Sequence, residues 1–237
     1  MTAPPPKSDA PAIPPLCNGD HLDRIEFERR YEAMPHVNKA ELIEGVVYMP
    51  SPVAFESHGE EHAHLMGWLV TYRAYTAGVR VGDNSTVRLD LDNEPQPDAL
   101  LLRDPTRGGR TRIVGRYIEG GPELAAEVAA SSVSIDRNAK LRAYQRNGVQ
   151  EYVLWRVEDG AIDWFRLHGG QYEPLPASGG ILRSGMFPGL WLDPAALIAA
   201  DMPRVFAVLQ QGLASPEHAA FVTALQQAGS TPPAPPA

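Results

Sequence analysis

Residues 123–155 have the sequence ELAAEVAASSVSIDRNAKLRAYQRNGVQEYVLW. An apolar run at residues 123–129 predicts a strand, and the apolar run at residues 152–157 predicts a second one. Between them, residues 135–147 predict a helix that ends at Gly148, because glycine is the preferred residue after a last helical turn. Strands on both sides of a helix favour an α/β or α+β fold with a central sheet.

Segments upstream of this stretch extend the predicted sheet. The sequence ELIEGVVYM (41–49) predicts a strand or a tight hairpin with a turn at Gly45. Residues 59–77 carry apolar side chains at helical intervals and predict a helix. Residues 79–91 and 98–102 predict further strands. We therefore expect helices packed against a sheet to which several separate segments contribute.

Two regions are expected to lie outside this regular core. The sequence TRGGRTRIVGRYIEGG (106–121) is polar and rich in glycine, and it predicts a mobile loop. Residues 194–210 and 216–228 predict short helices that close the domain, the second of them peripheral.

Both ends of the chain are rich in proline and poor in apolar residues, which is typical of flexible segments. We expect a disordered leader at residues 1–19, a folded domain at 20–212, and a helix followed by a proline-rich tail at 213–237. Nothing approaches the roughly 18 apolar residues of a membrane-spanning helix. With one cysteine and no signal peptide, the sequence indicates a cytoplasmic protein that does not enter a membrane.

The formal net charge of −8 argues against tight, non-specific binding of nucleic acid. Basic residues are nevertheless concentrated locally, in two groups that form either a solvated face or a track for phosphates. The first group is Arg103, Arg107, Arg110, Arg112 and Arg116, and the second is Arg137, Lys140, Arg142 and Arg146.

Chemistry is indicated by Asp98, which follows Pro97, by Glu127 in the next apolar strand, and by Lys140 on the following helix. Hydrolysis of a phosphodiester needs an activated water and relief of the charge that builds on phosphorus. Mg²⁺ supplies both and prefers carboxylate oxygens, and a nearby lysine stabilises the developing charge. By spacing alone this signal is weak, because these residue types are abundant.

Alternatives exist for each acid. Asp98 is either a metal ligand or an acid at a strand edge after Pro97. Glu127 lies in the apolar sequence LAAEVAA, where an unpaired buried carboxylate is costly. It therefore either points to solvent or binds something, and we favour binding.

Five segments, in order along residues 20–200, resemble the Uma-two family of restriction-endonuclease-like proteins within the PD-(D/E)XK nuclease superfamily. They are ELIEG (41–45), EHAHLMGWL (61–69), EPQPDALLL (94–102), the stretch at 123–155, and MFPGLWLD (186–193). The resemblance implies a restriction-endonuclease-like mixed central sheet flanked by helices, with metal-dependent nuclease activity.

The resemblance also implies roles for individual residues. Asp98 occupies the PD position and would bind metal together with Glu127. The superfamily places a lysine two residues after the glutamate, where this sequence has Ala129. The family resemblance implies that Lys140 replaces it from the following helix. An ordinary surface pair of Asp136 and Lys140 is the alternative.

Three further residues of the same stretch are candidates for supporting roles. Asp136, Lys140 and Tyr144 are spaced to lie on one helical face directed toward Glu127. Ser132, or Ser131 in its place, would cap the helix or contact phosphate.

Upstream acids and histidines complete the candidate set. Glu41 would complete the metal shell through a water, with Glu44 as the alternative. His62 would act as a base, orient the site or simply pack. Zinc held by His58 and His62 is disfavoured, because no third ligand is evident and the pattern is not that of a zinc protease.

We therefore expect a Mg²⁺- or Mn²⁺-dependent endonuclease that hydrolyses DNA. Its catalytic residues would be Asp98, Glu127 and Lys140. A catalytically silent protein that uses the same fold for binding or as a scaffold is the alternative from another class. Hydrolysis of another kind of phosphoester uses the same site. The resemblance also raises the expectation of a homodimer, because restriction-type nucleases often pair to cut two strands.

Overall fold

The computed structural model describes residues 12–49, 58–130 and 132–229. Most of the proline-rich ends and Ser131 lie outside the described residues. Among the helices of the described part, none combines the length and the apolarity that crossing a membrane requires.

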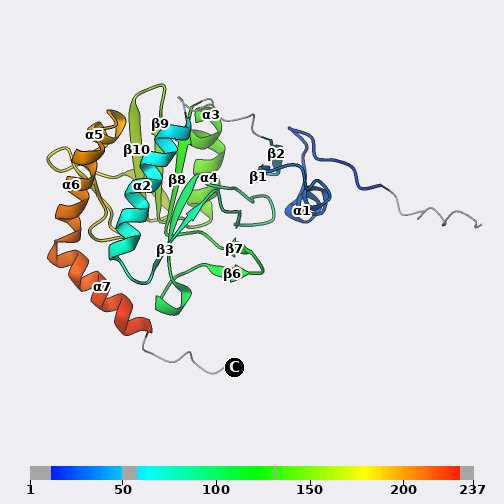
Figure 1. Cartoon of the computed structure of the whole chain (residues 1–237). Helices are drawn as coiled ribbons and strands as arrows, with labels where there is room; N and C mark the ends of the chain where they lie inside the picture. The colour runs from blue at the N-terminus through cyan, green and yellow to red at the C-terminus, as the bar shows by residue number, and fades with distance from the viewer. Residues whose placement is uncertain (1–11, 50–57, 131, 230–237) are drawn as a thin grey trace, which may run out of the picture.

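A six-stranded mixed sheet forms the centre of the fold, in the order β11-β10-β9-β8-β5-β3 (Figure 1). Only β8 and β9 are parallel, and the other neighbouring pairs are antiparallel. The strands are β3 (Val79–Asp83), β5 (Ala99–Arg103), β8 (Leu124–Ala129), β9 (Glu151–Arg156), β10 (Ala161–His168) and β11 (Gln171–Pro174). The predicted mixed sheet flanked by helices is confirmed.

Helices cover both faces of this sheet (Figure 1). One face packs against α2 (Glu60–Tyr75), α5 (Pro194–Ile198), α6 (Met202–Leu213) and α7 (Pro216–Gly229). The other face packs against α3 (Val133–Ile135), a π-helical segment (Asp136–Lys140) and α4 (Leu141–Arg146), which follow one another without a break. The helix predicted at residues 135–147 is thus present, with a π-helical first part.

Strand alternation divides the side chains of β8 between the two faces. Ala126 and Val128 belong to the core beneath α2, α5 and α6. Ala125 and Ala129 belong to the smaller core beneath α4. Because Glu127 lies two residues from each of the latter pair, its side chain is directed toward the α4 side of the sheet.

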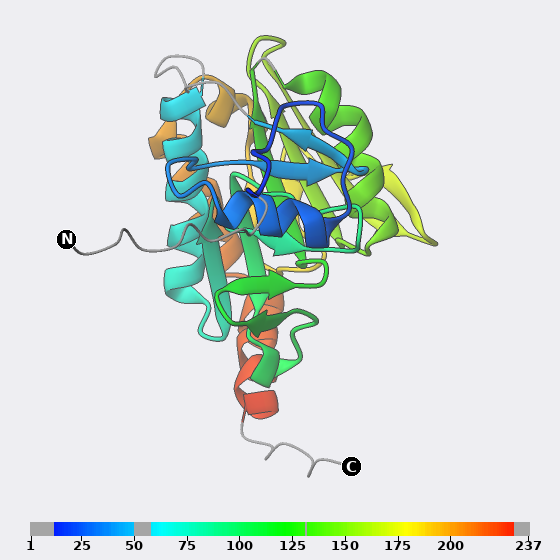
Figure 2. The same ribbon diagram turned by 90° about the vertical axis from the view of Figure 1, so that its right-hand side faces the viewer.

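The N-terminal segment adds α1 (Arg24–Glu32) and the hairpin of β1 (Glu41–Ile43) and β2 (Val46–Tyr48). Figure 2 shows them in front of the sheet. A separate apolar cluster holds them together, and Leu16, only 4% exposed, is part of it. The disordered leader expected for residues 1–19 therefore does not include the stretch around Leu16.

The prediction that residues 106–121 form a loop is wrong. This region contains β6 (Arg112–Val114) and β7 (Tyr117–Glu119), which pair with each other, and β7 also pairs with β4 (Val87–Arg88). The side chains of β6 are exposed and β7 buries only Ile118, so no apolar alternation marked these strands in the sequence.

The C-terminal region also differs from expectation. The helix predicted at residues 194–210 is two helices, α5 and α6, separated near Ala200, whose φ of 55° is incompatible with a continuous helix. The last helix, α7, is not peripheral, because its Leu225 is buried in the main core. The remaining short strands, β12 (Leu182–Arg183) and β13 (Trp191–Leu192), pair with each other.

Candidate functional site

Two acids face each other across neighbouring strands. Ala99 of β5 is paired with Ala126 of the antiparallel strand β8, so continuing the register by one residue sets Asp98 opposite Glu127. Directly opposed residues point to the same face, with Cβ atoms about 4.5–5.5 Å apart. Both side chains are almost fully buried, with 4% and 2% of the residue exposed. The sheet register thus brings together two acids that are far apart in the sequence.

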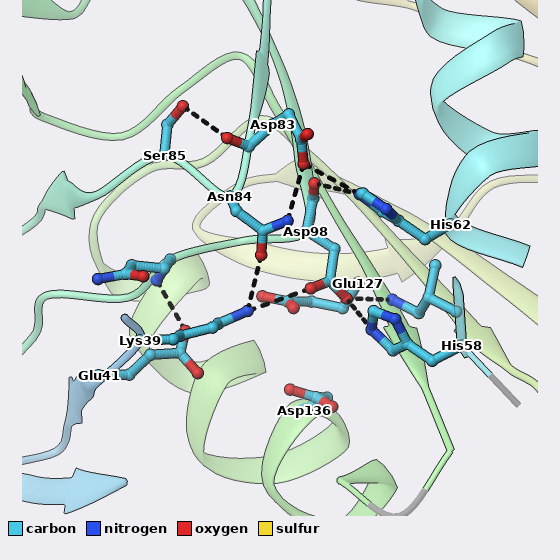
Figure 3. A network of polar contacts seen from close by, with 12 residues as sticks. Lys39, Glu41, His58, His62, Asp83, Asn84, Ser85, Asp98, Glu127 and Asp136 are labelled. Atoms are coloured by element: carbon cyan, nitrogen blue, oxygen red, sulfur yellow. Dashed lines mark hydrogen bonds and ion pairs between the residues drawn. The ribbon is translucent and has the colours of Figure 1, made fainter. Parts of the chain in front are cut away.

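Asp98 is held by three donors from different parts of the chain (Figure 3). Its Oδ2 accepts a hydrogen bond from the backbone N–H of Val128 at 2.9 Å and contacts Nε2 of His58 at 3.1 Å. Its Oδ1 accepts a bond from Nζ of Lys39 at 3.2 Å. Burial raises the pKa of Asp98, but these contacts outweigh burial and hold the pKa below its usual value. Asp98 is therefore an ionised carboxylate.

Glu127 is in a different state. Its Oε1 accepts hydrogen bonds from Nζ of Lys140 at 3.0 Å and from the hydroxyl of Tyr144 at 2.8 Å. Burial raises the pKa of Glu127 to about 8, against the opposing effect of Lys140 and with the support of the neighbouring carboxylates. Protonation of this side chain at neutral pH relieves part of the negative charge around it.

Lys140 lies at the centre of the acids. Its Nζ is 2.9 Å from Oε1 of Glu41, 3.0 Å from Oε1 of Glu127 and 3.3 Å from Oδ1 of Asp136. Burial lowers the pKa of Lys140, but the three carboxylates outweigh it and raise that pKa well above its usual value. The side chain is only 4% exposed, so the alternative of a surface pair with Asp136 is wrong.

The cluster carries an excess of negative charge. Asp98, Glu127, Glu41 and Asp136 are four buried acids, whereas the ammonium groups that contact them belong to Lys39 and Lys140. If every group were ionised, two negative charges would remain uncompensated, and the raised pKa values of Glu127 and Asp136 reflect their burial together with this excess. The charge of one divalent cation equals this excess.

The donor chemistry of the cluster suits a hard cation. Mg²⁺ and Mn²⁺ prefer carboxylate oxygens, and Asp98, Glu127 and Glu41 offer them from three different strands or strand ends. In the described part of the chain, no three His, Cys, Asp or Glu side chains already stand as a metal-binding group. Instead, Lys39 and Lys140 contact the acids that would serve as ligands.

Of the other predicted residues, Glu41 joins the cluster, and Glu44 does not. Glu41 is fixed by the backbone N–H of Gln96, which donates to its Oε1 at 2.7 Å. Glu44 lies in the β1–β2 turn and pairs with Arg146 at 2.7 Å. Glu44, the alternative to Glu41, therefore does not belong to the cluster.

His62 and Ser132 support the site indirectly. Nε2 of His62 lies 2.9 Å from the backbone oxygen of Asp98 and 3.2 Å from Oδ1 of Asp83, so it contacts the main chain and not the Asp98 carboxylate. Ser132 is the N-cap residue of α3 but makes no capping bond with its side chain. Burial raises the pKa of Asp136, and Ser132, which lies near that carboxyl, opposes the rise by favouring its ionised form.

Two side chains that contact Asp98, Lys39 and His58, were missed by the sequence interpretation. Lys39 also donates to Oδ1 of Asn84 at 3.0 Å, and it precedes the predicted ligand Glu41 by two residues (Figure 3). Residues two apart in an extended segment share a face, and this spacing was the available signal. His58 was considered only for zinc, although its ring stacks on that of His62 with centroids 5.8 Å apart.

Comparison with solved structures supports the assignment of the fold. A crystal structure of a putative nuclease belonging to DUF820, from Anabaena variabilis, aligns with a TM-score of 0.51 and 13% sequence identity. The alignment covers 76% of this chain and 97% of that one. A search of curated proteins gives no match.

Comparison with family models identifies the family. The model of the family Uma2, described as "Putative restriction endonuclease", matches residues 26–195, which include every acid and lysine of the cluster. This match covers most of the chain and agrees with the order of the five segments noted above. The chain belongs to the Uma2 family of restriction-endonuclease-like nucleases.

Proposed function

We propose that this protein is a Mg²⁺- or Mn²⁺-dependent endonuclease that hydrolyses phosphodiester bonds of DNA. One observation carries the proposal: Asp98, which directly precedes β5, and Glu127 of the adjacent strand β8 are both buried, within a cluster whose acids outnumber its lysines. Holding more acids than lysines together in a buried cluster costs free energy, and the raised pKa values of Glu127 and Asp136 reflect this cost. A protein that used this fold only as a scaffold would not need buried acids that lower its stability.

Each residue has a role that follows from its contacts. Asp98, ionised and fixed by Val128, Lys39 and His58, is a rigid carboxylate ligand. Glu127 offers Oε2 in addition to the Oε1 that Lys140 and Tyr144 engage. A bound divalent cation would supply an activated water and would offset charge on the phosphate.

The two lysines complete the chemistry. Lys140 orients Glu127 and holds positive charge beside the position where negative charge develops on phosphorus. Lys39 contacts Asp98 at 3.2 Å, with 25% of its side chain exposed. This partial exposure makes Lys39 the lysine that is accessible to a phosphate oxygen.

The proposal is tested with supercoiled plasmid, linear duplex, single-stranded DNA and RNA, each incubated with Mg²⁺, Mn²⁺ or EDTA. We expect cleavage of DNA that requires the metal. Asp98→Asn and Glu127→Gln are expected to lower the rate by at least about a hundredfold. Glu173→Gln is the matched control, because Glu173 is a half-exposed carboxylate in β11.

The outcomes separate the alternatives. Cleavage that persists in both site variants contradicts the assignment of the site. Cleavage of RNA alone corrects the substrate. The absence of cleavage of every nucleic acid by a folded protein with either metal favours a silent binding protein or a different phosphoester substrate.

A further inference from the structure

A surface pocket of about 460 Å³ lies between the start of α1 and the three-stranded sheet of β4, β7 and β6. We call it the arginine pocket. Four of its lining residues are Arg24, Arg88, Arg110 and Arg112, and Glu119 lines it as well.

These arginines come together only through folding. Arg24 is the first residue of α1, Arg88 belongs to β4, Arg112 belongs to β6, and Arg110 lies just before β6. Like charges that converge from separate elements repel each other unless anions accompany them. Negatively charged groups are therefore needed near these four arginines to offset their repulsion.

The acids of the protein supply only part of that charge. Nε of Arg88 is 2.7 Å from Oε1 of Glu28, and Arg112 is 3.5 Å from Oε2 of Glu119. Arg110 forms no ion pair with any residue in the described ranges. Its guanidinium has one polar contact, a long bond of 3.5 Å to the backbone oxygen of Gly148.

A second guanidinium is incompletely satisfied. Nη1 of Arg24 bonds to Glu28 at 3.3 Å, but Nε of Arg24 is buried and has no hydrogen-bond partner among the described residues. A buried donor without an acceptor is costly. Because that atom is closed to solvent, an anion with several oxygens would bind in the pocket through the exposed guanidinium groups of Arg110 and Arg112 and would balance the excess of positive charge.

The other arginines of the same sequence group have structural roles. Arg103 donates to the backbone oxygen of Met186 at 2.9 Å, and Arg107 donates to that of Leu225 at 3.0 Å. Arg116 lies over the ring of Tyr117. Of the five arginines at residues 103–116, only Arg110 and Arg112 therefore remain as candidates for contacting phosphate.

Helix α4 connects the pocket with the acidic cluster. Arg110 contacts Gly148, just beyond the end of α4, whereas Lys140 precedes the start of that helix. Eight residues at the rise of a helix correspond to about 12 Å. This is the length of backbone between Lys140 and Gly148, and at 3.4 Å per nucleotide along one strand of duplex DNA it is comparable with a few nucleotides. The elements that form the pocket also share a side of the molecule with β1, which carries Glu41 (Figures 1 and 2).

We propose that the arginine pocket binds a backbone phosphate of the nucleic-acid substrate, a few nucleotides from the scissile bond. This inference rests on the proposed nuclease function. Guanidinium groups bind phosphate oxygens through paired hydrogen bonds, and such contacts fix the register of a nucleic acid without reading its sequence. Free phosphate has the same chemistry, so the experiment has to separate the two sources.

The test measures the binding of labelled single-stranded and duplex DNA to the full chain in EDTA, by fluorescence anisotropy at several salt concentrations. The variant Arg110→Gln/Arg112→Gln is expected to bind every sequence about tenfold more weakly. The slope of log K against log salt is expected to become shallower by about 1–2 for duplex DNA. Arg166→Gln, which removes a half-exposed arginine from β10, is the control and is expected to bind like the wild type.

Folding of each variant is checked by its thermal melt. The single variant Arg112→Gln keeps the test valid if the double variant unfolds, because the side chain of Arg112 is 79% exposed. Unchanged affinity and an unchanged salt slope in a folded variant overturn the proposal.

A second arm uses inorganic phosphate and pyrophosphate in thermal-shift measurements. Stabilisation by these anions that the double variant abolishes, together with unchanged DNA binding, assigns the pocket to free phosphate and overturns the nucleic-acid assignment.

The two proposals fail in distinguishable ways. A wild type that cleaves DNA but whose double variant binds normally overturns the pocket alone. A wild type that binds DNA through the pocket but never cleaves it overturns only the nuclease proposal. A wild type that binds no nucleic acid contradicts both.

Discussion

Replacing Lys140 with methionine tests how the acidic cluster is stabilised. Methionine nearly matches lysine in length but removes the ammonium that contacts Glu41, Glu127 and Asp136 at 2.9–3.3 Å. Removing one partner from a buried ion pair costs about 3–5 kcal/mol, because the remaining charges are left without compensation. For a chain of this size, 1 kcal/mol shifts the melting temperature by about 2–4 °C, so we expect a fall of roughly 6–20 °C.

The assay is thermal unfolding followed by circular dichroism, in EDTA and in excess Mg²⁺. Glu127→Gln removes one of the acids that Lys140 compensates, so the double variant is expected to be more stable than the sum of the single effects predicts. Arg166→Gln is the control, because it breaks only an exposed pair with Glu173, worth at most about 1 kcal/mol. If Lys140→Met melts within the range of the control, or if the two site variants are strictly additive, the electrostatic account is refuted.

Three further predictions concern stability, each measured by urea unfolding. Tyr144→Phe removes a buried hydrogen bond to the cluster, at an expected cost of about 1–2 kcal/mol; no loss would contradict it. Burial and a nearby carboxylate raise the pKa of Glu94 to about 8 from its usual 4.5, so the folded state binds this proton more tightly than the unfolded chain. Wild-type stability relative to Glu94→Gln should therefore fall as pH rises from about 5 to 9, and a constant difference would refute this. Gly212→Ala would set a Cβ 2.2 Å from the backbone oxygen of Gly189 and should destabilise, whereas Gly67→Ala, whose nearest contact is at 3.8 Å, should stabilise by up to about 1 kcal/mol; equal effects would contradict the packing argument.

The sequence was most informative where an apolar, strand-like segment contained a charged residue. The apolar strand that contains Glu127 was predictable from its composition, and the carboxylate within it marked the site because buried charge is costly. Gly148 marked the end of the helix, and its φ of 72° explains why glycine stands there. Spacing along that helix placed Lys140 and Tyr144 on the same side, and both contact Glu127.

Sequence patterns of this kind could not predict contacts between residues that are distant in the chain. Lys39 reaches Asp98 across 59 residues of chain, and His58 reaches it across 40. Neither lies in a segment whose periodicity fixes its direction, so only the folded arrangement reveals the contact. The strands of residues 112–119 were missed for a related reason. They are short, and what stabilises them is pairing with β4 and the burial of the single side chain Ile118 against Val87, Leu100 and Leu102.

Ala129 shows how the fold accommodates the absence of a lysine two residues after Glu127. Position 129 shares a strand face with Glu127, but it is fully buried in the apolar cluster that contains Tyr144. A lysine there would have to desolvate its ammonium within that cluster, at a cost of several kcal/mol. Lys140 instead approaches from the facing helical layer and comes within 3.0 Å of Glu127, where two more acids compensate it. Since the ammonium is beside the glutamate in either arrangement, alanine at residue 129 is not by itself an argument that the site is silent.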